Sequence, residues 1–221
     1  MPSLELGSTA ELSVLRVPAK LLLASGNPGK LRELETLLAR AGLELLSPRQ
    51  VGLGEQVEET GQDYAENASL KARAFARASG MWALADDTGL EVEALGGAPG
   101  LRSSRLVGED GGDAERRARL LELLAPHPTP WPARFRTCLA LADPAGQVDL
   151  VHSICPGEIV AEARGTAGFG YDPIFQVMGT GKTLAEMTLE GKNLVSHRAQ
   201  AFRSLLPVLR RRLGLPPPDP G

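Results

Sequence analysis

Short apolar runs alternate with amphipathic segments in the first half of this 221-residue chain. Residues 20–24, 43–46 and 81–85 are apolar runs bounded by polar or turn-forming residues, a pattern typical of buried strands. Between the first two runs, leucines at positions i, i+3, i+6 and i+7 of residues 31–38 predict a helix, which Gly42 ends. Strand, helix and strand in this order are typical of an α/β fold.

Helical patterns also occur later in the chain. We expect helices at residues 63–79 and at residues 114–124, the latter with Asp113 as its N-cap. A last helix is expected at residues 197–213, where Pro207 should kink the helix or make it restart.

The remaining segments predict more strands. Residues 90–95 alternate between apolar and polar positions and predict a strand of their own. Residues 135–142 and 148–154 flank an Asp-Pro-Ala-Gly turn and predict a hairpin, and residues 158–163 are expected to add a strand. Residues 165–173 are glycine-rich and irregular. We therefore predict an α/β fold with a mixed sheet flanked by helices.

We expect one domain at residues 19–214, between a loose extension at 1–18 and a disordered, proline-rich tail at 215–221. The extension has no basic region before an apolar core, so we do not predict a secretory signal. No apolar run approaches the ~20 residues of a membrane-spanning helix, so no membrane partner is expected.

Charge and cysteine usage narrow the functional class. The net charge of −3 and the pI near 5.7 argue against a nucleic-acid-binding protein, which is usually basic. Cys138 and Cys155 lie far apart in the chain and fit reduced thiols better than a disulfide framework. The histidines do not have zinc-site spacing. We therefore expect a cytoplasmic protein with no nucleic-acid partner.

The adjacent carboxylates Asp86 and Asp87 are the strongest chemical signal in the chain. They follow the apolar run at residues 81–85 and precede Thr88 and Gly89, so we place them at the end of a strand. Two acids at such a position are costly unless a positive charge meets them, and Mg²⁺ prefers one or two carboxylates with waters and phosphates. The alternative interpretation is a strand-end turn in which Asp86 caps the local backbone.

Residues 25–30, with the sequence Ser-Gly-Asn-Pro-Gly-Lys, lie between a predicted strand and a predicted helix. Backbone N–H groups at a helix start attract anions, and Lys30 adds positive charge. An ordinary strand-to-helix turn is the alternative. The segment is not a P-loop, because Ala24 and Leu31 occupy positions where that motif has glycine and serine or threonine. Residues 179–183 do not complete the P-loop motif either.

Other candidate residues have ordinary alternatives. The acidic residues between 55 and 66 usually form a solvated face, and Lys71 taken alone is typical of a surface. Phe169 and Tyr171 lie in a flexible loop, where aromatic rings either stack on a base or cover the core. His197 and Arg198 follow Ser196, a good N-cap; such side chains either donate to a carbonyl oxygen or face water.

Together these segments resemble one family, the inosine/xanthosine triphosphate pyrophosphatases. The resemblance extends from about residue 21 to residue 213 and keeps the family's order of motifs. It rests on residues 24–30, 58–61, 66–72, 85–90, 95–100, 168–175, 185–188 and 192–199. It implies an elongated mixed sheet flanked by helices, with two lobes and the active-site cleft between them.

The resemblance also implies the role of each candidate residue. The triphosphate would be held by one loop and one later lysine: Ser25, Gly26, Asn27, Pro28, Gly29, Lys30 and Lys192. Asp87 would bind Mg²⁺ and act as general base, with Lys71 as the second catalytic residue. The metal site would also include Glu58 and Asp86, with Glu66 in support. Thr88 would contact the substrate, and the nucleoside end would be bound by Phe169, Gly170, Tyr171, Asp172, His197 and Arg198.

The implied activity is Mg²⁺-dependent hydrolysis of deaminated purine nucleoside triphosphates (ITP, dITP and XTP) to the monophosphate and pyrophosphate. Such an enzyme clears these compounds from the nucleotide pool, and the bacterial members of the family are homodimers. Two alternatives remain open. One is a pyrophosphatase of related fold that acts on other modified nucleotides, and the other is a nucleotide-binding module without turnover.

Overall fold

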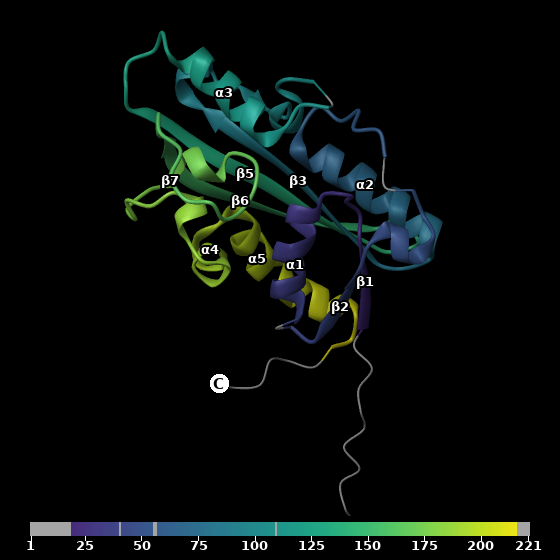
Figure 1. Cartoon of the computed structure of the whole chain (residues 1–221). Helices are drawn as coiled ribbons and strands as arrows, with labels where there is room; N and C mark the ends of the chain where they lie inside the picture. Colours follow the sequence, from purple (N-terminus) through teal and green to yellow (C-terminus); the bar gives the residue numbers. More distant parts are fainter. Residues whose placement is uncertain (1–18, 40, 55–56, 109, 216–221) are drawn as a thin grey trace, which may run out of the picture.

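The computed structural model describes residues 19–39, 41–54, 57–108 and 110–215. Its strands form a mixed sheet in the order β2-β1-β3-β5-β6-β7, with β4 paired to β3 (Figure 1). The β1 strand pairs in parallel with β2 and β3, whereas the pairs from β3 to β7 are antiparallel. The predicted mixed α/β fold is therefore confirmed. The predicted extension and most of the tail lie outside the described residues.

The sheet is built from strands of very different length. Its strands are β1 (Ala19–Leu23), β2 (Leu43–Leu46), β3 (Ala83–Val92), β4 (Pro99–Gly100), β5 (Trp131–Ala142), β6 (Val148–Ile159) and β7 (Phe175–Val177). The α-helices of the described chain are α1 (Pro28–Ala39), α2 (Tyr64–Ser79), α3 (Asp113–Leu124), α4 (Leu189–Val195) and α5 (His197–Arg212). The long β5–β6 hairpin connects the two ends of the molecule (Figure 1).

Three apolar clusters hold these elements together. Leucines of β1, α1 and α5 pack on one face of the sheet, where Leu84 of β3 points. The α2 helix packs on the opposite face, where its alanines and Phe75 meet Ala83 and Ala85. A third cluster joins α3 to the far ends of β3, β5 and β6 and to β7. The first two clusters form one lobe and the third forms the other.

The aspartate pair does not end a strand. The predicted strands at residues 81–85 and 90–95 are one strand, β3, and Asp86 and Asp87 lie within it. The prediction was wrong because the two acids find cations on neighbouring elements and therefore tolerate burial. Gly89 also makes no turn. A Cβ there would lie 2.3 Å from the carbonyl oxygen of Gly100, so the glycine permits close strand approach.

Other predicted boundaries need smaller corrections. No strand occupies residues 160–163; β6 ends at Ile159, and β7 forms its outer partner. Asp113 is the first residue of α3 and not its cap, which is Gly112. The last helix continues through Pro207 without restarting. The helix predicted at 63–79 is confirmed, with Asp63 capping it by accepting a hydrogen bond from the Glu66 N–H.

Two further observations concern the bulk properties. Cys138 and Cys155 are buried free thiols, as predicted. No helix within the described residues has the length and apolar character needed to cross a membrane.

Candidate active site

A cleft of about 860 Å³ lies between the two lobes. This volume is in the usual range for small-molecule sites. Most of the predicted site residues line it: Ser25, Gly26, Asn27, Lys30, Glu58, Lys71, Asp87, Thr88, Phe169, Gly170, Tyr171, Asp172, Lys192, His197 and Arg198. The predicted residues Pro28, Gly29 and Asp86 are not part of its lining.

The loop between β1 and α1 forms one wall of the cleft. Asn27 caps α1, because its Oδ1 accepts hydrogen bonds from the N–H groups of Gly29 (2.8 Å) and Lys30 (3.1 Å). Ser25 Oγ in turn accepts one from the Asn27 N–H at 3.2 Å. The Lys30 ammonium reaches across to donate to the backbone oxygen of Asp86 at 3.0 Å. This wall therefore presents a helix N-terminus and a lysine.

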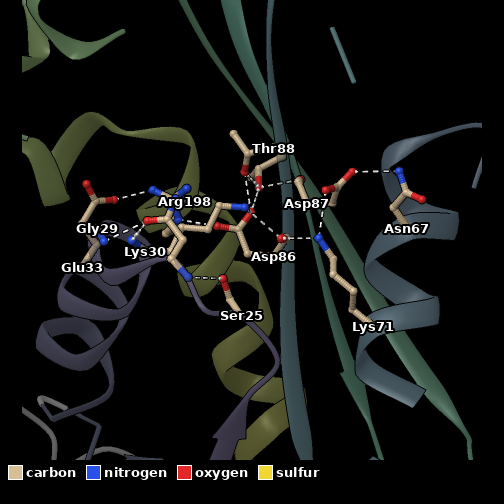
Figure 2. A network of polar contacts seen from close by, with 12 residues as sticks. Ser25, Gly29, Lys30, Glu33, Asn67, Lys71, Asp86, Asp87, Thr88 and Arg198 are labelled. Atoms are coloured by element: carbon tan, nitrogen blue, oxygen red, sulfur yellow. Dashed lines mark hydrogen bonds and ion pairs between the residues drawn. The ribbon is translucent and has the colours of Figure 1, made fainter. Parts of the chain in front are cut away.

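Asp87 and Lys71 form the opposite wall. Lys71 Nζ lies 3.0 Å from Asp87 Oδ1 and 2.7 Å from Glu59 Oε1, and Arg105 pairs with the other oxygen of Glu59. The remaining oxygen, Asp87 Oδ2, accepts only a long hydrogen bond of 3.5 Å from Asn67 in the described part of the chain (Figure 2). Asp87 thus keeps one oxygen that is weakly held.

Burial and charge act in opposite directions on this pair. Burial raises the pKa of Asp87 above its usual range, and the nearby charges of Lys71 and Lys30 only partly offset this. Burial lowers the pKa of Lys71, but the carboxylates of Asp87 and Glu59 outweigh it, so the pKa rises. Lys71 is therefore a stable cation beside a carboxylate that binds a proton more readily than usual.

Asp86 and Asp87 point to opposite sides of β3 (Figure 2). Asp86 is completely buried; Oδ1 accepts from the hydroxyls of Thr88 and Thr137, and Oδ2 pairs with Arg198. Burial opposes ionisation of Asp86, yet Arg198 and Lys30 hold its pKa well below the usual range. The geometry gives no support to Asp86 as a metal ligand, because groups of the protein already occupy both carboxylate oxygens.

A second group of buried charges lies at the back of the cleft, where Asp172, Lys192 and Arg198 form part of its lining. Lys192 Nζ is 2.6 Å from Glu33 Oε1 and 2.5 Å from Asp172 Oδ2, and Arg198 Nη1 is 2.5 Å from Glu33 Oε2. We call Glu33, Asp86, Asp172, Lys192 and Arg198 the buried ion cluster. It joins α1, β3, α4 and α5 to the loop that ends at Asp172.

Phe169 lies over this cluster. Its ring centroid is 5.1 Å from Lys192 Nζ and 5.6 Å from the guanidinium carbon of Arg198. This places Lys192 with the predicted base-binding residues Phe169 and Arg198, although the resemblance assigned it to the triphosphate. The ring rests on Gly29, where an added Cβ would lie 2.5 Å from Phe169 Cδ1. The loop itself is held by Asp172, which accepts a hydrogen bond of 2.8 Å from the Phe169 N–H.

Tyr171 and His197 are both buried at the edge of the cleft. The Tyr171 hydroxyl donates to the backbone oxygen of Ser103 at 2.8 Å, and its ring belongs to the third apolar cluster. The His197 ring stacks on Phe135 with centroids 4.6 Å apart. Both of its nitrogens lack a hydrogen-bond partner among the described residues. Burial lowers the pKa of His197 well below its usual value, so the imidazole is neutral.

Comparisons with known proteins agree with this architecture. A sequence model of the Ham1 family matches residues 21–208. The chain belongs to the Ham1 family. A relative in Synechococcus sp. (strain CC9311) is 49% identical over 194 residues, covering 87% of this chain and 91% of that protein. A relative in Shigella flexneri is 47% identical over 196 residues, covering 86% and 98%. Both relatives are named dITP/XTP pyrophosphatase.

Solved structures of the Ham1 family share the fold. A HAM1 protein from Coxiella burnetii has a TM-score of 0.78 at 40% identity, over 87% of this chain and 99% of that chain. The Staphylococcus aureus Ham1 protein has a TM-score of 0.76 at 34% identity, with the same coverage. The predicted family and fold are therefore confirmed.

Several residues of this Ham1-family site are missing from the sequence prediction. Thr137 donates a hydrogen bond to Asp86, and Glu33 accepts one from Arg198, the partner of Asp86. Glu59 accepts one from Lys71. By residue type, the sequence does not distinguish the buried Glu33 from the exposed Glu35 in the same helix. The signal that could have identified Glu33 is Leu37, an apolar residue four positions later on the same helix face. The supporting role predicted for Glu66 is local: its carboxylate accepts from the Gln62 N–H at 2.7 Å.

Proposed function

We propose that this chain hydrolyses deaminated purine nucleoside triphosphates (ITP, dITP and XTP) to the monophosphate and pyrophosphate. One observation supports this most strongly. A single cleft carries Lys30, Lys71 and Asp87 in one part, and Phe169 over buried hydrogen-bond donors in another. The first set suits a polyphosphate and the second suits a base. The relatives are named for two of these substrates, dITP and XTP.

The phosphate-binding part of the cleft combines cations with a helix N-terminus. Lys30 and Lys71 both direct their ammonium groups to the Asp86 backbone oxygen, at 3.0 Å and 3.1 Å, so they approach the same point from opposite walls. A triphosphate between them would be neutralised from two sides. Such charges stabilise the negative charge that builds on phosphoryl oxygens in the transition state.

We propose that Asp87 acts as the general base. Its weakly held Oδ2 can accept a proton from water, and its raised pKa makes it a better base than an ordinary aspartate. The activated water would attack the α-phosphorus, and pyrophosphate would leave. Lys71 would hold Asp87 in place and stabilise the developing charge.

Mg²⁺ is the proposed cofactor. The carboxylates of Glu58 and Asp87 line the cleft beside the lysines, whereas the described residues contain no group of three metal-binding side chains. This donor set fits Mg²⁺, which needs only one or two carboxylates when waters and substrate phosphates complete its shell. Glu58 and Asp87 would hold the ion, which would supply further charge neutralisation at the phosphates.

Selectivity for the base would come from buried polar atoms around Phe169. The guanidinium of Arg198 and the one N–H of the neutral His197, whose ring nitrogens lack partners among the described residues, lie at the cleft, where a 6-oxo group offers an acceptor. A 6-amino group is not an acceptor and would leave these two donors unpaired. Sites of this kind reject the wrong analogue by up to ~10⁴–10⁵ in favourable cases. Phe169 would stack on the purine.

We further propose that the protein is cytoplasmic, as its two free thiols suggest, and that it is a homodimer, as the family resemblance implies. Leu150 and Ile154 are exposed at equivalent outward positions of β6 and would suit a surface covered by a second copy. Light scattering after size-exclusion chromatography measures the molar mass and so tests the homodimer directly. A monomer at micromolar concentration would contradict it.

A substrate panel tests the proposed function. ITP, dITP, XTP, ATP, GTP, CTP and UTP are supplied with Mg²⁺ at mildly alkaline pH, and pyrophosphate and orthophosphate are scored separately. We expect pyrophosphate from ITP, dITP and XTP and little from ATP or GTP. Orthophosphate release, or activity confined to pyrimidine nucleotides, would contradict the proposed substrate. No turnover of any nucleotide would favour a binding module.

A further inference from the structure

Glu33 is an unusual residue for the middle of α1. Its side chain is only 5% exposed, and each of its oxygens pairs with a different buried cation. Burial opposes its ionisation, but Arg198 and Lys192 outweigh that effect and lower its pKa. Glu33 is therefore an ionised carboxylate that bridges the two cations beneath Phe169.

Such an arrangement is weak evidence for a stabilising role. Buried ion pairs lose much of their attraction to desolvation, and well-packed apolar side chains often replace them without loss of stability. The ion cluster therefore invites a functional explanation. Lys192 and Arg198 both line the cleft, whereas Glu33 lies behind them and does not line it.

The contacts of Glu33 determine which donors face the cleft. Arg198 uses Nε for Asp86 and Nη1 for Glu33, and Lys192 uses two of its three N–H groups for Glu33 and Asp172. Within the described residues, this leaves Nη2 of Arg198, the second N–H of its Nη1 and one N–H of Lys192 for a ligand. Without Glu33, both side chains would be free to rotate about their remaining carboxylate contact.

We propose that Glu33 is a positioning residue for purine selectivity: it orients Arg198 and Lys192 so that their unused donors meet a 6-oxo purine under Phe169. This inference rests on the proposed function, because it assigns the base-reading step of that reaction. Glu33 also lies one helical turn after Lys30 of the phosphate wall. The same short helix therefore positions groups at both ends of the proposed nucleotide.

The test compares Glu33→Gln with Glu35→Gln. Glu35 lies on the same helix but is exposed, so it is a matched control. Binding of the α,β-methylene analogues of ITP and ATP is measured by calorimetry, and kcat/KM is measured for ITP and ATP. We expect Glu33→Gln to lower the preference for the inosine nucleotide about 10–100-fold, as expected for a lost hydrogen bond between charged groups. Glu35→Gln should leave it unchanged.

Glu33→Asp covers the case in which Glu33→Gln does not fold. It keeps the charge but is one methylene shorter, so it cannot reach both cations, and it should lose part of the preference. The proposal would be overturned if a folded variant kept the wild-type ratio of inosine to adenosine binding, even if both nucleotides bound equally more weakly. A wild type without base preference would also overturn it. Base-selective binding that depends on Glu33, found without turnover, would refute the proposed function and support this inference.

Discussion

Gly29→Ala is a small change that tests the proposed position of the base. Gly29 is the second residue of α1 and its φ is not positive, so the backbone tolerates alanine. The new Cβ would lie 2.5 Å from Phe169 Cδ1 and 2.6 Å from Cγ. Because Cγ is on the ring axis, rotating the ring does not relieve the contact, and the whole ring must move.

The size of that movement sets the expected effect. Carbon atoms pack at ~3.5–4.0 Å, so the ring must shift by about 1 Å. A misplacement of that size can cost ~10²-fold in rate, and stacking of an aromatic ring on a base contributes ~1–3 kcal/mol. We therefore expect kcat/KM for ITP to fall about 10–100-fold. The free energy of unfolding should change by no more than about 1 kcal/mol, because alanine favours the helix.

Gly191→Ala is the matched control for this variant. Gly191 also lies in a helix, α4, but a Cβ there would meet its nearest atom, Thr188 Oγ1, at an ordinary 3.5 Å. Steady-state kinetics with ITP and urea unfolding are measured for both variants. We expect Gly191→Ala to keep wild-type kinetics. Unchanged kcat/KM in a folded Gly29→Ala protein would refute the role assigned to Phe169.

Three other perturbations follow from the charges of the site. Lys71→Met removes the cation beside Asp87 and should lower kcat for ITP about 10²-fold; kinetics within a few-fold of wild type would contradict this. A chelator should abolish hydrolysis and excess Mg²⁺ should restore it, whereas turnover in the chelator would exclude the proposed cofactor. His197 has a depressed pKa in the folded state, so the unfolded chain binds the extra proton as pH falls below ~6.5. Stability should then decline by up to about 1.4 kcal/mol per pH unit, measured by urea unfolding. His197→Gln should lose this pH dependence, and an equal slope in that variant would contradict the assignment.

The sequence predicts the parts of the site that local motifs carry. Ser25 to Asn27 and Lys30 of the strand-to-helix loop, the carboxylate of Asp87 and the loop at Phe169 all line one cleft, as the order of the motifs implied. Local patterns also located α2 and the central hairpin. These predictions worked because capping residues and alternating apolar positions act over a few residues.

Long-range pairing explains what the sequence analysis missed. Asp86 is tolerated within β3 because Arg198 meets it from 112 residues away, and no local pattern reports that contact. The strand was therefore divided at the wrong place. Glu33 and Glu35 are equally acidic positions in one helix, and only the packing of α4 and α5 against α1 makes one of them buried.

The most direct test of the account compares wild type with Asp87→Asn. Asparagine keeps the shape of the side chain and removes the proton acceptor, while Lys30 and the Phe169 pocket stay intact. Pyrophosphate release from ITP and binding of its α,β-methylene analogue are measured on the same samples. The account predicts that the variant folds and binds the analogue but releases no pyrophosphate, whereas near-normal pyrophosphate release would remove Asp87 from the catalytic role.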